Sequence, residues 1–315
     1  MTIYNLGSIN IDHVYAVDHF VRPGETMTSR GLASHAGGKG FNQSVALARA
    51  GAQVVHIGAI GADGRALLAA LERDGVDVSA ITVEAETPTG HAIIQVDPQG
   101  RNCIIVAPGA NATLTPDAVR AALAAAKPGD LLLAQNETSA IAEAIRDAKA
   151  RGLRVALNPA PMDGRVETQP LELVDTLVVN EIESVQLLDL HGVAAPGSPT
   201  AALEALRRLH PHAQIIMTLG EDGAIAADTD GAVSQVPAFR VQAVDTTAAG
   251  DTFTGFFLAS QARGVTTTEA LRLASAAAAI AVTRHGAAPS VPTINEVEAW
   301  LAAQNDERTD GNNGI

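Results

Sequence analysis

Cysteine is almost absent from this chain of 315 residues, which contains only Cys103. A single cysteine forms neither an intrachain disulfide nor a cysteine zinc site, so the sequence fits a reducing compartment. Basic residues are also scarce, with 21 Lys and Arg against 35 Asp and Glu, which gives a net charge of −14 without any basic cluster. This balance argues against nucleic acid or an anionic membrane as the main partner.

Long hydrophobic runs and a leader segment are missing as well. The first residues, MTIYNLGSIN, have no basic region and no extended apolar stretch, which predicts no signal peptide. The most apolar helical stretch, LASAAAAIAV, lies between Arg272 and Arg284 and is too short to span a bilayer. It is typical of a buried, Ala-rich helix. With 47% hydrophobic and 18% charged residues the chain can form a complete core, and we expect a soluble, cytoplasmic protein.

Short apolar runs alternate with helical patterns along most of the chain. The runs that predict strands buried on both faces are TIYNLGSI, QVVHIGAIG, DLLLAQ, LRVALNP, TLVVN and AQIIMTLG. The segments between them have helical spacing, and most end near a glycine. This alternation predicts an α/β fold of three layers, in which helices cover both faces of a mostly parallel central sheet.

Residues 12–36 and 87–107 interrupt the alternation. Both segments have strand-like patterns, and the second contains the turn signal Asp97-Pro98-Gln99-Gly100. They predict a small β-sheet that protrudes from the main domain as a lid. We therefore expect one domain over residues 1–303 that includes the lid, followed by a disordered tail over residues 304–315.

Two N-terminal motifs place polar groups where a ligand could bind. In the run Ser8-Ile9-Asn10-Ile11-Asp12, the side chains of Asn10 and Asp12 share one strand face, where they suit a polyhydroxylated ligand or form an ordinary solvated edge. The run AGGKGFNQSVALARAGA places Gly37, Gly38 and Gly40 before a predicted helix. It is either a tight turn or a ligand cradle. It is not a nucleotide-binding P-loop, because Ala33 and Gly40 stand where that motif requires Gly and Ser or Thr.

Two further motifs follow predicted strands. Asn180 and Glu183 have the spacing of a helix capping box, which alone would explain both residues. The two roles are compatible, since a capped helix start at the carboxyl end of a strand also faces the ligand crevice. The run MTLGEDGAI, with Gly220 and Gly223, is typical of a hairpin whose amides could also line a nucleotide.

The run VDTTAAGDTF contains two acids, Asp245 and Asp251, around small residues. Because Ala248, Ala249 and Gly250 have little bulk, their N–H groups can converge on an anion at a helix N-terminus. Asp251 is then placed either as a general base or as a plain helix N-cap. The run alone does not decide between these.

Together these motifs resemble a known family. GGKGFNQSVALARAGA and DTTAAGDTFTGFFLA look like the two signature motifs of the phosphofructokinase-B-type sugar kinases, and the order of the minor motifs over about residues 3–301 is similar to the ribokinase branch. The resemblance implies a ribokinase-like fold and ATP-dependent phosphorylation of the ribose 5-hydroxyl. It implies Asp251 as the base and the amides of Ala248, Ala249 and Gly250 as the anion hole.

The resemblance also implies ligand-binding residues. Those implied to hold the sugar, beside Asp251, are Asn10, Asp12, Gly38, Lys39, Asn42 and Glu137. Those implied to meet the nucleotide are Asn180, Glu183, Thr218, Gly220, Glu221, Gly223, Gly250 and Ser275, with Glu183 positioning Mg²⁺ through water. A K⁺ site built mainly from carbonyl groups would use Asp245, Thr247, Ala281, Arg284, Gly286 and Ser290.

The motifs indicate the identity of the substrate and the oligomeric state less directly than they indicate the site residues. His91, Ile93 and Val106 of the lid are expected to face the sugar, and there the substrate could change to 2-deoxyribose, another sugar or a nucleoside. The 3% aromatic content offers little stacking surface for a nucleoside base. A sugar sensor without catalysis is a further alternative, against which the intact Asp251 argues. The resemblance also implies a homodimer formed through the lid sheets.

Overall fold

The computed structural model describes residues 1–310, and side chains up to residue 304. A nine-stranded sheet forms its centre, in the order β13-β12-β11-β10-β9-β8-β1-β4-β5. The parallel strands are β1 (Thr2–Leu6), β4 (Gln53–Gly61), β5 (Ile81–Glu84), β8 (Leu131–Gln135), β9 (Arg154–Asn158), β10 (Thr176–Asn180) and β11 (Gln214–Thr218). The antiparallel strands at one edge are β12 (Ala224–Ala227) and β13 (Val233–Val236).

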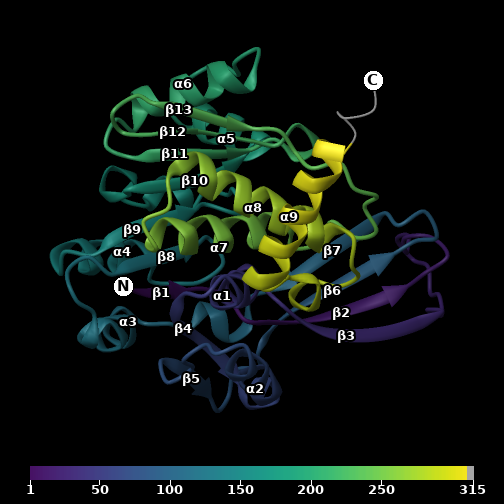
Figure 1. Cartoon of the computed structure of the whole chain (residues 1–315). Helices are drawn as coiled ribbons and strands as arrows, with labels where there is room; N and C mark the ends of the chain where they lie inside the picture. Colours follow the sequence, from purple (N-terminus) through teal and green to yellow (C-terminus); the bar gives the residue numbers. More distant parts are fainter. Residues whose placement is uncertain (311–315) are drawn as a thin grey trace.

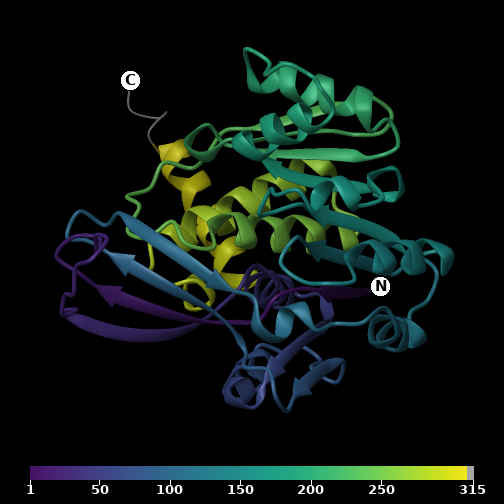
Figure 2. The same ribbon diagram turned by 180° about the vertical axis from the view of Figure 1, so that it is seen from behind.

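Helices cover both faces of this sheet, as Figures 1 and 2 show from opposite sides. One face is covered by α1 (Lys39–Arg49), α2 (Arg65–Arg73), α7 (Ala249–Ala262), α8 (Thr267–Val282) and α9 (Ile294–Asp310). The other is covered by α3 (Pro116–Ala122), α4 (Ile141–Ala150), α5 (Glu181–Leu190) and α6 (Pro199–Leu209). The three-layer prediction is confirmed.

The strands are buried on both faces because their residues alternate between two apolar cores. In β1, Ile3 packs with the first group of helices, whereas Tyr4 and Leu6 pack with the second. Helix α8 is lined with buried alanines, as its sequence predicts, and this lack of bulk lets it pack closely against α7. No helix in the described part of the chain is both long and apolar enough to cross a membrane.

A separate four-stranded sheet, here called the lid, has the order β3-β2-β6-β7. Its strands are β2 (Asn10–Ala16), β3 (Gly31–Gly37), β6 (Gly90–Val96) and β7 (Asn102–Ala107). They come from the two segments that the sequence predicts, and in Figure 1 they extend beyond the helical layers. Strand β2 pairs antiparallel with β3 and parallel with β6, so the lid joins two distant parts of the chain.

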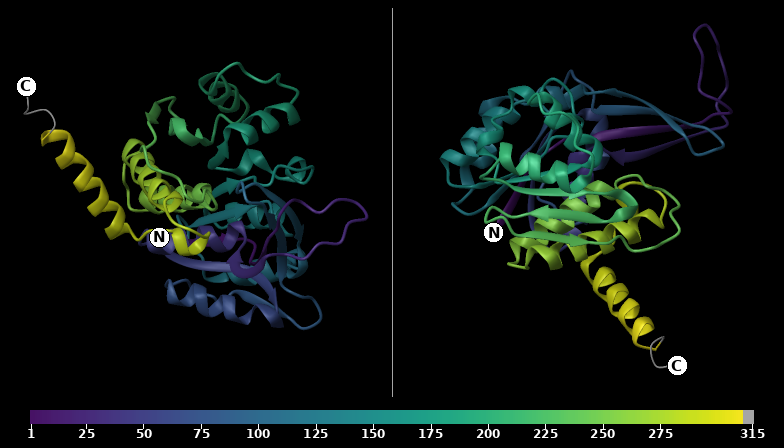
Figure 3. Two further views of the ribbon diagram at one scale, coloured as in Figure 1. Left: turned by 90° about the vertical axis from the view of Figure 1, so that its right-hand side faces the viewer. Right: turned by 90° about the horizontal axis from the view of Figure 1, so that it is seen from above.

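The disordered tail predicted over residues 304–315 stays a prediction, and the last helix extends into that segment. Helix α9 continues through Asp310, and Figure 3 shows it leading away from the body. The segment 304–310 contains neither Gly nor Pro, so nothing in it stops the helix. Residues 311–315 of the predicted tail lie outside the described residues.

Candidate active site

The candidate site lies at the carboxyl ends of the parallel strands. A cavity of about 160 Å³ is lined there by residues from five separate segments: Lys39, Asn158, Ala160, Val178–Asn180, Glu183, Thr218, Thr246, Ala248–Asp251 and Thr254. Strands β9, β10 and β11 end at this cavity, which is where an open parallel sheet binds its ligands. The structure therefore brings together Lys39, Asn180, Glu183, Thr218 and Asp251, as predicted.

The glycines around the start of α1 have a packing role that the sequence does not reveal. Gly38 adopts a φ of 91°, which favours glycine, as α1 begins. A Cβ atom on Gly40 would lie 2.4 Å from the backbone of Gly7, and one on Gly37 would lie 2.0 Å from the Asp12 carboxylate. These two glycines let chain segments approach one another, as the tight turn requires. The ligand cradle stays a prediction.

Asn10 and Asp12 share one face of β2, as predicted, and Asn10 is fixed in place. Asn111 Nδ2 donates to Asn10 Oδ1 at 2.7 Å, and Asn111 also bonds the backbone N–H and carbonyl of Ile9. The sequence alone assigns no role to Asn111. Its contacts join residues about one hundred positions apart, which no local pattern indicates.

Asn42 links the first signature motif to the second. Its Nδ2 donates to Asp251 Oδ2 at 3.0 Å, while its Oδ1 is buried without a partner among the described residues. A buried acceptor without a partner is uncommon, and here it is available to a ligand hydroxyl. Asp251 is therefore not the N-cap of α7. That position is Ala248, and the carboxylate of Asp251 is bound across the site.

Glu137 follows β8 and ties three segments together. Its Oε2 accepts from the Ser8 hydroxyl and from the Lys39 N–H at 3.0 Å. It thereby joins the end of β8 to the loop after β1 and to the start of α1. The position at the carboxyl end of a strand is the only local signal for this residue.

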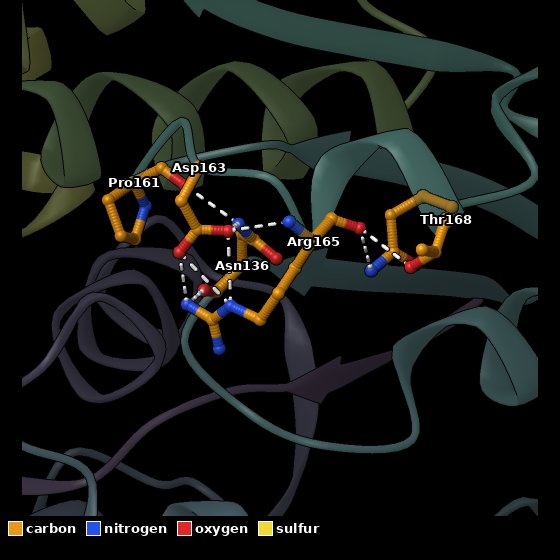
Figure 4. A network of polar contacts seen from close by, with 6 residues as sticks. Asn136, Pro161, Asp163, Arg165 and Thr168 are labelled. Atoms are coloured by element: carbon orange, nitrogen blue, oxygen red, sulfur yellow. Dashed lines mark hydrogen bonds and ion pairs between the residues drawn. The ribbon is translucent and has the colours of Figure 1, made fainter.

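A polar cluster holds Asn136, the residue that precedes Glu137 after the end of β8 (Figure 4). Asn136 Nδ2 donates to Asp163 Oδ1 at 3.0 Å, and Arg165 donates to the Asn136 carbonyl at 2.7 Å. Arg165 also pairs with Asp163 at 2.8 Å, and this contact lowers the pKa of the Asp163 carboxyl. The loop after β9 thus holds the backbone next to Glu137.

Carboxylates dominate the charge of the site. Burial, together with the nearby Glu137, raises the pKa of Asp12 to about 6, although His35 opposes this. Burial also raises the pKa of Glu183. Burial alone would lower the pKa of Lys39, but Asp251, Glu137 and Glu183 outweigh it and raise that pKa. Lys39 is therefore a firmly charged ammonium group among several carboxylates.

Helix α7 begins at the cavity with a left-handed residue. Ala248 has φ 59° and ψ 13°, a conformation that is costly for a residue with a Cβ atom. The first N–H groups of a helix have no carbonyl four residues back and are available to an anion. The Ala249 N–H makes a long bond of 3.3 Å to the Thr246 carbonyl. The residues predicted to form the anion hole, Ala248, Ala249 and Gly250, thus line the cavity beside Asp251.

The predicted nucleotide residues fall into three groups. Asn180 and Glu183 form the predicted capping box, with bonds of 2.8 and 2.9 Å, and both line the cavity together with Thr218. Gly220 and Glu221 lie in an exposed turn beyond it, and Gly223 leads into β12, so the predicted hairpin is confirmed. Ser275 is buried within α8 and does not line the cavity.

Comparison with known proteins shows the family of the chain. A profile of the pfkB family carbohydrate kinases matches residues 2–294. The chain belongs to this family.

Among the relatives of this pfkB-family chain is the ribokinase of Haemophilus influenzae, 39% identical over 95% of this chain and 98% of that protein. A solved structure of Cryptococcus neoformans ribokinase in complex with ADP matches with a TM-score of 0.86 at 36% identity, covering 95% of this chain and 99% of that one. Arabidopsis thaliana ribokinase complexed with ribose and ATP matches with a TM-score of 0.82 at 28% identity, covering 95% and 98% of the two chains.

In this pfkB-family chain, Asp245 joins the two loops predicted to bind K⁺. Its Oδ1 accepts from the Thr247 N–H and its Oδ2 from the Gly286 N–H, both at 2.9 Å. Burial alone would raise the pKa of Asp245, but these bonds outweigh it and lower that pKa. The predicted carbonyl groups of Ala281, Arg284 and Ser290 lie in the second loop or at the helix end that precedes it.

The lid register corrects one expectation about substrate contacts. Asp12 pairs with Ala92, which pairs with Val106, so Val106 shares the face of Asp12. His91 and Ile93 are one residue out of phase and lie on the opposite face, where the ring of His91 contacts that of His13. The expectation that all three face the sugar is therefore wrong for His91 and Ile93, because side chains alternate along a strand.

Proposed function

We propose that the protein transfers the γ-phosphoryl group of ATP to the 5-hydroxyl of D-ribose, giving ribose 5-phosphate and ADP. The observation that supports this most directly is the Asp251 carboxylate, which lies at the start of α7 and is bonded to Asn42 of the other signature motif. One residue thereby borders both a polar cluster suited to hydroxyl groups and a helix N-terminus suited to phosphate.

The sugar would lie between the lid and α1. Asn10, Asp12, Asn42 and Glu137 supply amide and carboxylate groups, which bind hydroxyls as donors and acceptors. The unpartnered Asn42 Oδ1 is one such acceptor. Gly38 and Lys39 border this region at the start of α1. The ribose-bound Arabidopsis neighbour supports this choice of sugar over other polyols.

The chemical step would depend on position and charge. Asp251 would accept the proton of the 5-hydroxyl, and its two oxygens are already oriented by donors. The N–H groups at the start of α7 would stabilise the charge that develops on the transferred phosphoryl group. Holding both groups in place is the main task, because phosphoryl transfer needs little covalent chemistry from the protein.

The nucleotide site would also need a divalent cation. Lys39 stands among Asp251, Glu137 and Glu183, so triphosphate binding requires added positive charge. Glu183 would position Mg²⁺ through water, because its Oε2 already accepts the Asn180 N–H. The cation would neutralise the phosphate charge. Asn180, Thr218, Gly220, Glu221, Gly223 and Ser275 are proposed to contact or shape the nucleotide site.

A monovalent cation would order the loop before the anion hole. The donors proposed for K⁺ are oxygens, mainly carbonyl groups, which suit a large monovalent ion. Asp245 joins the loop that leads into α7 to the loop around Gly286. Fixing Asp245 and Thr247 would therefore fix the start of α7.

The assembly is proposed to be a homodimer formed through the lids, in a reducing cytoplasm. The lid exposes apolar side chains on both faces: Ile104 and Val106 on the face of Asp12, and Leu32, Ile93 and Ile105 on the opposite face. A second copy would cover part of this surface.

The proposal is tested by ATP-dependent phosphorylation of ribose, 2-deoxyribose, fructose and adenosine, each with and without K⁺. We expect ribose to have the highest kcat/KM and K⁺ to increase it, because the cation orders the α7 loop. A coupled ADP assay and mass spectrometry of the product measure this. A higher kcat/KM for another member of the panel would replace ribose as the substrate, and an inert protein would contradict the kinase function.

A further inference from the structure

The Asp251 carboxylate has a second donor besides Asn42. Gln43 Nε2 donates to Asp251 Oδ1 at 2.9 Å, while Asn42 Nδ2 bonds Oδ2, so neighbouring residues of α1 hold the two oxygens separately. Gln43 is fully buried, with no exposed surface, and does not line the cavity. Its role is therefore different from that of a substrate ligand.

Gln43 belongs to a buried chain of polar side chains, and its Nε2 also donates to Asn158 Oδ1 at 3.1 Å. Gln135 Nε2 donates to Gln43 Oε1 and to Asn5 Oδ1, both at 2.8 Å. Asn5 Nδ2 bonds the Ser44 hydroxyl at 2.8 Å, and Ser44 bonds His56 Nδ1 at 2.8 Å. The chain ends where His56 Nε2 meets the Gly7 carbonyl at 3.1 Å. All five side chains of this chain are completely buried.

The hydrogen bonds of this buried series have only one consistent assignment of donors and acceptors. The Gly7 carbonyl can only accept, so His56 donates from Nε2 and accepts at Nδ1 from Ser44. Burial lowers the pKa of His56 to about 4, which keeps the ring neutral and this tautomer fixed. Ser44 then accepts from the Asn5 amide, whose oxygen accepts from Gln135.

The same constraint reaches the Asp251 carboxylate. Gln135 presents its NH₂ group to Gln43 Oε1, so the NH₂ group of Gln43 faces Asp251. A flipped Gln43 would direct its oxygen at a carboxylate and its NH₂ group at another NH₂ group. In a buried network each mismatch leaves a polar group unpaired, which is costly. The orientation of Gln43 is therefore fixed from within the core.

We propose that Gln43 is a positioning residue, which holds the Asp251 carboxylate in its working orientation through the buried chain Gln135–Asn5–Ser44–His56. This inference rests on the proposed role of Asp251 as the base. The chain connects β1, β4 and β8 at the centre of the sheet to the base on α7. The catalytic carboxylate is thus aligned by the core of the fold as well as by the substrate.

The variant Gln43→Met tests the proposal, since it keeps the volume and removes the bonds. We expect kcat for the preferred sugar to fall roughly 10-fold to 100-fold, the scale of a misplaced catalytic group. The KM for that sugar should change less than about 3-fold, because Asn42 and the other sugar ligands remain. A KM increase with unchanged kcat would overturn the proposal by making Gln43 a binding residue. An unchanged kcat and KM would overturn it as well.

Gln135→Met gives a second, independent measurement if Gln43→Met does not fold. It leaves Gln43 in place but removes the donor that orients it, so kcat should fall by a smaller factor. In the double variant kcat should be no lower than in Gln43→Met alone, because both residues act along one path. Multiplied losses would mean independent roles and would overturn the proposal. So would full kcat in a folded Gln135→Met.

Gln214→Met is the matched control. Gln214 is also a buried glutamine that donates to a carboxylate, Asp228 Oδ1 at 2.5 Å, but it lies at the start of β11, away from the site. Its replacement should lower the melting temperature without lowering kcat. An equal kcat loss in this control would overturn the proposal, since the effect would then be general loosening. Activity of the unaltered protein on any sugar tests the kinase function separately from these ratios.

Discussion

Asp251 acts through partners that lie far away in the sequence. Asn42 and Gln43 precede it by 209 and 208 positions, yet they bond its two oxygens. A carboxylate that accepts from two amides has a fixed plane and keeps lone pairs free for a hydroxyl proton. This combination distinguishes it from the N-cap that its local sequence also permits.

Replacing this acid tests its role directly. Asp251→Asn should lower kcat by about 10²-fold to 10⁴-fold, the usual loss when a general base is removed, while sugar affinity changes little. Steady-state kinetics and calorimetric titration with ribose measure the two quantities.

The control is Asp228→Asn, at a carboxylate that also accepts from a glutamine but lies outside the site. The kcat of this control variant should stay close to that of the unaltered protein. Substantial turnover by Asp251→Asn would remove the base assignment.

Asp12 should make the ligand-free protein less stable as pH rises. Its pKa is about 6 in the folded state and near 3.8 when unfolded, because it is buried beside Glu137. Between these values the folded protein retains a proton that the unfolded chain has released, so the free energy of unfolding falls with increasing pH. Asp12→Asn cannot ionise and should become more stable than the unaltered protein by on the order of 2 kcal/mol at pH 7, with little gain near pH 4.

Urea unfolding at several pH values measures this difference. The control is Asp18→Asn, since Asp18 lies in an exposed lid loop and should show little change at any pH. A gain for Asp12→Asn that does not depend on pH would contradict the ionisation argument. Sugar affinity should fall in the same variant, because the Asp12 carboxylate that destabilises the ligand-free protein is also proposed to bind the sugar.

At the scale of elements, helix starts form much of the site. Helix α5 begins with a capping box at the cavity, and α7 begins with Ala248 in a left-handed conformation. The first arrangement follows from the spacing of Asn180 and Glu183 and is predictable. The second is not, because alanine rarely adopts a positive φ and no residue type marks the position.

Ala248→Val should lower both stability and kcat. A β-branched side chain is strongly disfavoured at a φ of 59°, so the first turn of α7 would move away from the phosphate. We expect a loss of about 1–3 kcal/mol in the free energy of unfolding and a kcat reduced roughly 10-fold or more. Thermal unfolding and steady-state kinetics measure the two effects.

Ala140→Val is the matched control, because Ala140 starts α4 with the same φ of 59°. It should lose similar stability while kcat stays close to that of the unaltered protein. An equal fall in kcat for both variants would show that strain alone, not the position of the α7 amides, explains the loss.

Most elements are predictable from the sequence because their signals are local. Apolar runs and helical spacing indicate the main strands and helices, and the turn around Gly100 marks the end of β6. The partners of the site are not local. Gly40 is needed because Gly7 approaches it across the loop, and Asn111 is needed because it bonds Asn10. No spacing rule connects such positions. The motifs therefore indicate a family resemblance, but they do not predict which side chains contact one another in the site.

At the scale of the whole molecule, substitutions on the exposed faces of the lid test the proposed dimer. Ile104 and Ile105 point to opposite faces of β7 and are 50% and 62% exposed. The double variant Ile104→Asp with Ile105→Asp puts a charge on each face, so whichever face meets the partner must bury one. We expect the dissociation constant to rise at least about 100-fold, because each 1.4 kcal/mol is a factor of ten.

Sedimentation equilibrium over a range of protein concentrations measures the association. Val233→Asp is the control, since Val233 is an exposed apolar residue of the edge strand β13 and not of the lid. This variant should remain dimeric. An unaltered protein that is monomeric at all concentrations would contradict the dimer.

Because β1 lies inside the sheet, its pairing with both neighbouring strands determines when the fold can be completed during synthesis. Strand β1 is made before its neighbour β8, which lies about 130 residues further along the chain, and the acid on α7 follows more than a hundred residues after that. Until β8 leaves the ribosome, one edge of β1 has unpaired backbone groups that can attract other strands. The nascent chain must therefore shield β1 until β8 has emerged, and phosphoryl transfer can begin only after α7 has emerged as well.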